Sequence, residues 1–107
     1  MIEIECGSGN VFADIGAADP EEMLVKAQLA AKVAEIIEAR KLKQAEAAEL
    51  VGLTQPKLSG VLRGKLRGVS EAKLLDCLRR LGRDVQIVVG PARRQAEPGR
   101  LEVVMAR

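Results

Sequence analysis

Apolar residues in the middle of the chain recur at intervals of three and four, which is the spacing of one buried helix face. The first such stretch begins after Asp19-Pro20, where aspartate is a helix N-cap residue and proline is tolerated at the first helical position. Its apolar stripe includes Met23, Ala27, Ala30, Ala34 and Ile37. The pattern predicts a helix from residue 20 to about Arg40.

Three shorter helices are predicted after it, each with its own start or stop signal. The segment Gln44–Val51 is followed by Gly52, and glycine readily adopts the left-handed conformation at a helix end. The next helix begins at Thr54 and ends at Gly64, and a last one begins at Ser70 and ends at Gly82.

The N-terminus of the third predicted helix allows one specific hydrogen bond to be predicted. Gln55 and Pro56 follow Thr54, and proline has no backbone N–H to donate. We therefore expect the Thr54 hydroxyl to accept a hydrogen bond from the Lys57 N–H.

Beyond Gly82 the apolar period changes from that of a helix to two, the period of a strand. Residues 85–89 and 101–106 are each expected to form a strand, joined by the long loop "GPARRQAEPGR". The fold class is thus mainly α, a bundle of four to five helices with a short C-terminal β extension. The opening "IEIE" is a weaker strand candidate.

The second and third predicted helices have the spacing of a helix-turn-helix. Ala48 allows two helices to cross closely, Gly52 turns the chain, and Leu58 and Val61 pack the second helix of the pair onto the first. The Gln44 amide and the free N–H groups beside it suit a phosphate. In this motif the second helix enters the major groove of DNA.

The outward face of that second helix carries the candidate DNA-binding side chains. At 100° per residue, Gln55, Ser59 and Arg63 form one ridge opposite the apolar side, and amides, hydroxyls and guanidinium groups hydrogen bond with base edges. Residues 53–68 contain four bases and no acid. We expect the DNA-binding residues to be Gln44, Gln55, Pro56, Lys57, Ser59, Gly60, Arg63, Lys65 and Arg67. The alternative for each is an ordinary solvated surface position.

Charge divides the chain, although its net charge is only +2. Residues 1–22 contain six acids and no base, so the two ends of the sequence are expected to contact different partners. We divide the chain into an acidic N-terminal arm at 1–19, a helix-turn-helix DNA-binding domain at 20–83 and a C-terminal β-strand dimerisation extension at 84–107.

Composition argues against an enzyme. The chain has no histidine, and Cys6 and Cys77 are far apart with no paired-ligand spacing, so ordinary zinc sites and histidine-assisted nucleophiles are not expected. Cys77 is expected to be a core residue, and so is Phe12, the only aromatic residue. No metal, cofactor or small-molecule ligand is predicted.

One recognition helix reads only a few base pairs, so a homodimer on a palindromic operator is expected. The strand 85–89 is apolar on both faces except at Gln86, which suits a strand covered on both sides. The predicted dimer interface consists of Val85, Ile87, Val88 and Val89.

The motifs are similar to those of a known family. Residues 20–82 resemble the lambda-repressor-like (XRE) domains, and the run from "NVFADIG" through "KQAEAAELVGLTQPKLSGVLRGKLRGVS" to "LGRDVQIVV" resembles the HigA-type antitoxins. The resemblance extends from about Asn10 to Val89. Two residues depart from it: many relatives have threonine or serine at the position of Lys43, and Gly60 occupies an outward position of the recognition helix without contributing a side chain.

The resemblance implies a homodimeric repressor of its own operon that also neutralises a HigB-type mRNA interferase, a toxin that is an RNase. It further implies that Gln44 touches phosphate and that Gln55 reads a base. Two alternatives stay open: a stand-alone or phage-type regulator without a toxin, and a pure protein-interaction module. No signal peptide or membrane span is apparent in the sequence, so a soluble cytoplasmic protein is expected.

Overall fold

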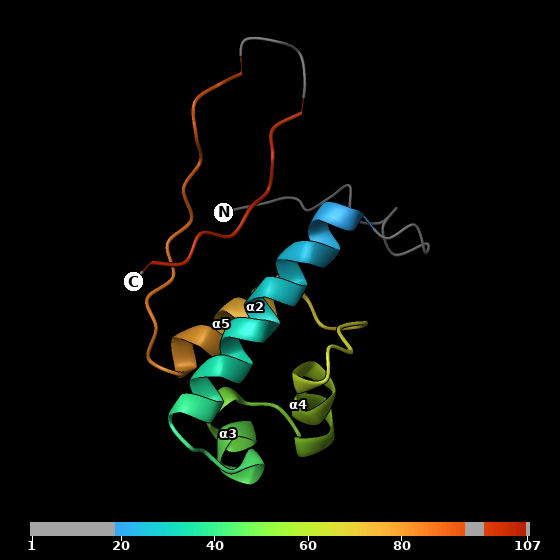
Figure 1. Ribbon diagram of the computed structural model, residues 1–107, viewed down its shortest axis with the longest axis vertical. Helices are drawn as coiled ribbons and strands as arrows, with labels where there is room; N and C mark the ends of the chain where they lie inside the picture. Colours follow the sequence, from blue (N-terminus) through green and yellow to red (C-terminus); the bar gives the residue numbers. More distant parts are fainter. Residues whose placement is uncertain (1–18, 94–97, 107) are drawn as a thin grey trace.

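The computed structural model describes residues 19–93 and 98–106. They contain four helices: α2 (Pro20–Ala39), α3 (Gln44–Val51), α4 (Gln55–Leu62) and α5 (Glu71–Arg80). The long α2 packs against α5 and α4, and the short pair α3 and α4 pack against each other (Figure 1). The predicted starts of the helices are confirmed, and α4 and α5 end two residues before the glycines predicted to end them, Gly64 and Gly82.

The core forms where the apolar stripes of the four helices meet. Val33 on α2, Val51 on α3, Leu58 on α4 and Leu74 on α5 are fully buried at its centre. The buried core of the described residues contains no charged or polar side chain. Cys77 is buried in it as expected, and this burial raises the pKa of the Cys77 thiol. Among the described residues, no helix is long and apolar enough to cross a membrane.

All four described helices end in the same hydrogen-bonded turn, the Schellman motif. In each, the residue after the C-terminal turn has a positive φ and the following N–H bonds back to a carbonyl five residues earlier, as in Leu53 N to Ala48 O at 2.9 Å. The positive-φ residues in these turns are Lys41, Gly52, Gly64 and Gly82. Three of the turns thus use the glycine that the sequence predicts, and the turn that ends α2 uses a lysine.

The N-terminus of α2 differs in one detail from a capping box, the arrangement in which the third helical residue bonds back to the N-cap. Asp19 caps α2 by accepting from the Glu21 N–H at 2.9 Å. Glu22, at the third position, instead lies beside Glu71 at the start of α5. A side-chain hydrogen bond with Glu71, together with partial burial and the neighbouring negative charge, raises the pKa of Glu22.

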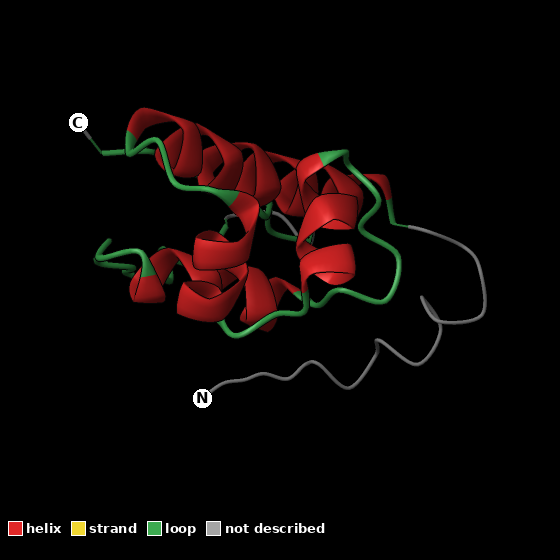
Figure 2. Ribbon diagram, turned by 90° about the horizontal axis from the view of Figure 1, so that it is seen from below, coloured by secondary structure: helices red, strands yellow, loops and turns green. Residues whose placement is uncertain are grey.

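The predicted C-terminal strands do not form within the described part of the chain (Figure 2). Residues 83–93 and 98–106 run as two extended arms that leave the bundle on the side away from α3 (Figure 1). Alternating apolar side chains suit a strand, but a strand also requires backbone hydrogen bonds to a neighbour. The described residues of the two arms make no such ladder, so the β extension is wrong for the single chain.

The second arm nevertheless rests on α2. The Leu101 N–H donates to the Glu21 carboxylate at 3.0 Å, and Val103 packs against the core. Val103 and Met105 of the arm also line a shallow hollow of about 250 Å³ together with residues of α2. These contacts hold the arm close to the helical domain.

The predictions for the N-terminal arm at 1–19, including Cys6, Phe12 and the "IEIE" strand, concern residues that lie outside the described part, apart from Asp19.

Candidate nucleic-acid interface

The turn between α3 and α4 has the geometry expected of a helix-turn-helix. Gly52 has a φ of 76°, which is why glycine suits this position, and Ala48 is buried where α3 crosses its neighbours. The Thr54 hydroxyl accepts from the Lys57 N–H at 3.3 Å, confirming the predicted cap. The start of α4 is therefore fixed by its own sequence.

The two faces of α4 are divided as the helical period predicts. Leu58 and Val61 are buried, whereas Gln55 and Arg63 are exposed and Ser59 is half-buried. Arg63 is the C-cap residue, one position beyond the last helical residue. The structure thus leaves the ridge of Gln55, Ser59 and Arg63 outside the core and available to a partner.

Two of the predicted cations, Lys57 and Lys65, lie near the turn that follows α4. A Cβ built at Gly60 would lie 3.8 Å from the Lys65 Cβ, and the Lys65 N–H donates to the Gly60 carbonyl at 2.8 Å. A Cβ built at Gly68 would lie 3.8 Å from the Lys57 Nζ, so Lys57 reaches the loop between α4 and α5. The turn after α4 therefore gathers positive charge beside the helix.

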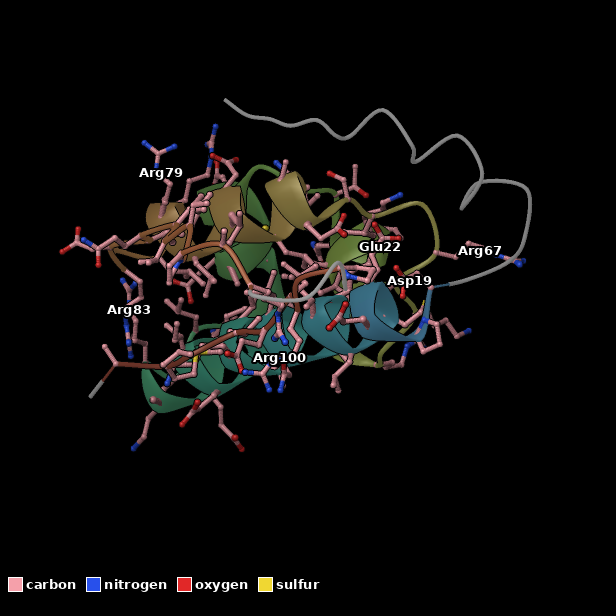
Figure 3. All side chains as sticks on the ribbon, turned by 90° about the horizontal axis from the view of Figure 1, so that it is seen from above. Asp19, Glu22, Arg67, Arg79, Arg83 and Arg100 are labelled. Atoms are coloured by element: carbon pink, nitrogen blue, oxygen red, sulfur yellow. The ribbon has the colours of Figure 1, made fainter. Side chains whose placement is uncertain are left out.

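Arg67 belongs to that same loop. It is exposed, and its side chain extends away from the helices (Figure 3). None of the ion pairs formed among described residues involves the four cations of 53–68. Their charge is consequently available for phosphate groups.

Gly60 is not required by the protein's own packing. It lacks a positive φ, and an added Cβ would meet only ordinary van der Waals contacts. Pro56, also predicted to face DNA, is exposed at the second position of α4. At Gly60 a partner can approach the backbone of α4 closely, because no side chain projects there.

The first helix of the pair also presents its N-terminus. Gln44 is exposed at the first position of α3. Its N-cap is Lys43, which has no oxygen acceptor and so cannot cap as serine or aspartate does. Glu46 supplies the other half of a capping box, because its carboxylate accepts from the Lys43 N–H at 3.0 Å.

A polar cluster on α5 supports the turn and was not predicted from the sequence. Lys73 Nζ donates to the Val51 carbonyl at 3.3 Å, at the end of α3, and forms an ion pair with Asp76 at 3.4 Å. Arg80 Nε donates to the same Asp76 carboxylate at 2.9 Å. The hydrogen bond from Arg80, followed by that from Lys73, lowers the pKa of Asp76. The period of α5 indicates only that these residues are off its apolar stripe.

The residues predicted for a dimer interface lie away from α4. Val85 is half-buried against the core, whereas Ile87, Val88 and Val89 are exposed on the first arm. The structure therefore separates the candidate DNA-binding residues from the candidate dimerisation residues.

Comparison with known proteins places the same segment in a known class. Residues 11–90 match the family described as "Helix-turn-helix domain". A solved structure named "Putative XRE Family Transcriptional Regulator" is similar to this chain, with a TM-score of 0.73 and 37% sequence identity. The similarity covers 80% of this chain and 97% of that chain. No curated protein matches the chain significantly.

Proposed function

The chain belongs to the XRE-type helix-turn-helix family of DNA-binding transcription regulators, and we propose that it is a sequence-specific repressor acting as a homodimer on a palindromic operator. The family is generally not enzymatic. The observation that carries the proposal is the division of α4, in which Leu58 and Val61 are buried while Gln55 and Arg63 stay exposed. Beside them lie Lys65 and Arg67, which form no ion pair with another described residue.

The residues of this surface have different roles in the proposal. Gln55, Ser59 and Arg63 contact base edges, and Pro56 and Gly60 let the backbone of α4 approach the groove floor. The remaining four contact phosphates: Gln44, Lys57, Lys65 and Arg67. Because Gly60 offers no side chain, base reading is concentrated in the three residues of the ridge.

Two single substitutions separate base reading from phosphate binding. Gln55→Ala is expected to cost about 1–3 kcal/mol at one operator position and to leave binding to random duplex nearly unchanged. Lys65→Ala is expected to weaken binding to every duplex and to reduce the slope of log affinity against log salt by about one. Quantitative gel shifts at several salt concentrations, on operator and random duplexes, measure both effects.

Gln28→Ala is the matched control, because Gln28 is an exposed glutamine of α2 that faces the C-terminal arm. It is expected to bind as the wild type does. Equal losses on both duplexes for Gln55→Ala would refute the base-reading role of Gln55. Wild-type binding that does not weaken with salt would favour the protein-interaction module instead.

We also propose that this regulator is the antitoxin of a toxin-antitoxin operon. Support comes from the resemblance to HigA-type sequences and from the acidic residues 1–22, which suit a basic RNase partner. The regulator without a toxin shares every DNA-binding feature, so the neighbouring gene distinguishes the two.

Co-expression with the protein encoded beside the gene tests the antitoxin role. A small basic RNase is expected to co-purify with the chain, and replacing Glu3, Glu5 and Asp14 by their amides is expected to reduce the yield of the complex. Glu38→Gln, at an exposed position of α2, is the control. An undiminished yield of the complex from the triple variant would show that these acidic residues do not contribute to toxin binding.

A further inference from the structure

The loop between α2 and α3, residues 40–43, contains two lysines at positions where the local backbone favours other residues. Lys41 has a φ of 55° and is the non-glycine residue with positive φ in the described part of the chain. Lysine pays a steric penalty in this conformation that glycine does not. The turns that end α3, α4 and α5 all use glycine at the equivalent position.

Lys43 is the second exception, at the other end of the loop. It is the N-cap of α3, where serine, threonine, aspartate or asparagine would accept a hydrogen bond from the first turn. A cation at a helix N-terminus is also unfavourable with the helix dipole. The caps of α2, α4 and α5 are Asp19, Thr54 and Ser70, and each accepts such a bond.

Neither lysine contributes to the core. Both are exposed, while Leu42 between them is the loop residue that packs against the core. The ion pairs found among the described residues include neither of them. Packing and ion pairing within the described fold therefore do not explain why lysine occupies both positions.

The location of the two lysines relates them to the DNA-binding surface. Lys43 directly precedes Gln44, and the loop lies with α3 and the start of α4 at the end of the bundle opposite the C-terminal arms (Figure 1). We infer that Lys41 and Lys43 contact the phosphate backbone of DNA and extend the interface across the α2–α3 loop. This inference rests on the proposed DNA-binding function. The two exposed ammonium groups would interact favourably with the negatively charged phosphates of a duplex at this position.

The test replaces each lysine by the residue that its backbone position favours, in Lys41→Gly, Lys43→Ser and the double variant. The probe is a random-sequence duplex of about three helical turns, because phosphate contacts do not depend on sequence. Each single variant is expected to bind it roughly 3–10-fold more weakly, and the double variant is expected to lose about 1.8 from the salt slope, at about 0.9 per phosphate. The thermal midpoints of unfolding should be equal to or higher than that of the wild type.

Arg100→Gly is the matched control, since it removes one exposed cation from the C-terminal arm. It should leave affinity and salt slope unchanged. The inference is overturned if the double variant binds as the wild type does, or if its thermal midpoint falls, which would show that the fold itself uses the lysines. If the lysine inference fails but Gln55→Ala still loses operator selectivity in the same assays, the proposed DNA-binding function is retained. If the wild type binds no duplex, both the lysine inference and the proposed function are refuted.

Discussion

Replacing both Ile87 and Val89 by aspartate is expected to convert the proposed homodimer into a monomer and to weaken operator binding by about 100-fold or more. Their side chains are 77% and 90% exposed in the single chain, so the change should cost the helical domain little. In a dimer that covers this arm, two unpaired carboxylates would be buried, which is strongly unfavourable. A monomer also loses the avidity of two linked half-site contacts.

Sedimentation equilibrium and operator gel shifts measure these two losses, and circular dichroism checks that the helices remain. Val104→Asp is the control, because Val104 is 82% exposed on the second arm and outside the predicted interface. A double variant that remains a dimer would place the interface elsewhere. A wild type that sediments as a monomer would contradict the homodimer itself.

Replacing Leu58 by alanine is expected to destabilise the domain by about 2–5 kcal/mol. Leu58 is 0% exposed and is part of the core that α4 shares with α2 and α3. Its removal leaves a cavity beneath the helix that presents Gln55. Since small domains have a total stability of about 5–15 kcal/mol, the variant should be partly unfolded near physiological temperature and should bind DNA less well for that reason.

Leu50→Ala makes the same chemical change at a leucine that is 38% exposed on α3. It is expected to cost under about 1 kcal/mol, because little buried area is lost. Urea denaturation of both variants gives the comparison. If Leu58→Ala were no more destabilised than Leu50→Ala, the burial of Leu58 would not be what fixes α4 on the core.

Much of the candidate site was predictable because its determinants are local. The helix limits follow from Asp19, Gly52, Thr54 and Ser70, whose caps and turns involve only neighbours in the sequence. The two faces of α4 follow from the helical period. The gathering of Lys57 and Lys65 beside α4 follows less directly, since it depends on how the loop after Gly64 folds back.

Other features depend on which segments meet in space. The bond from Lys73 to the Val51 carbonyl joins residues that are 22 positions apart, and the Glu22–Glu71 pair joins the starts of two helices. Sequence periodicity carries no information about such neighbours. The positive φ of Lys41 is a similar case, because the sequence shows no glycine that would mark this turn.

By itself, then, the sequence determined the four described helices, their ends and the polar ridge of α4, because capping, turn formation and the helical period act over a few residues. The tertiary structure decided what the C-terminal segments become. Residues 85–89 and 101–106 have the alternation of strands, but backbone pairing requires a partner that alternation does not supply. In the single chain they stay extended, with Val85 and Val103 packed against the core and Ile87, Val88 and Val89 exposed.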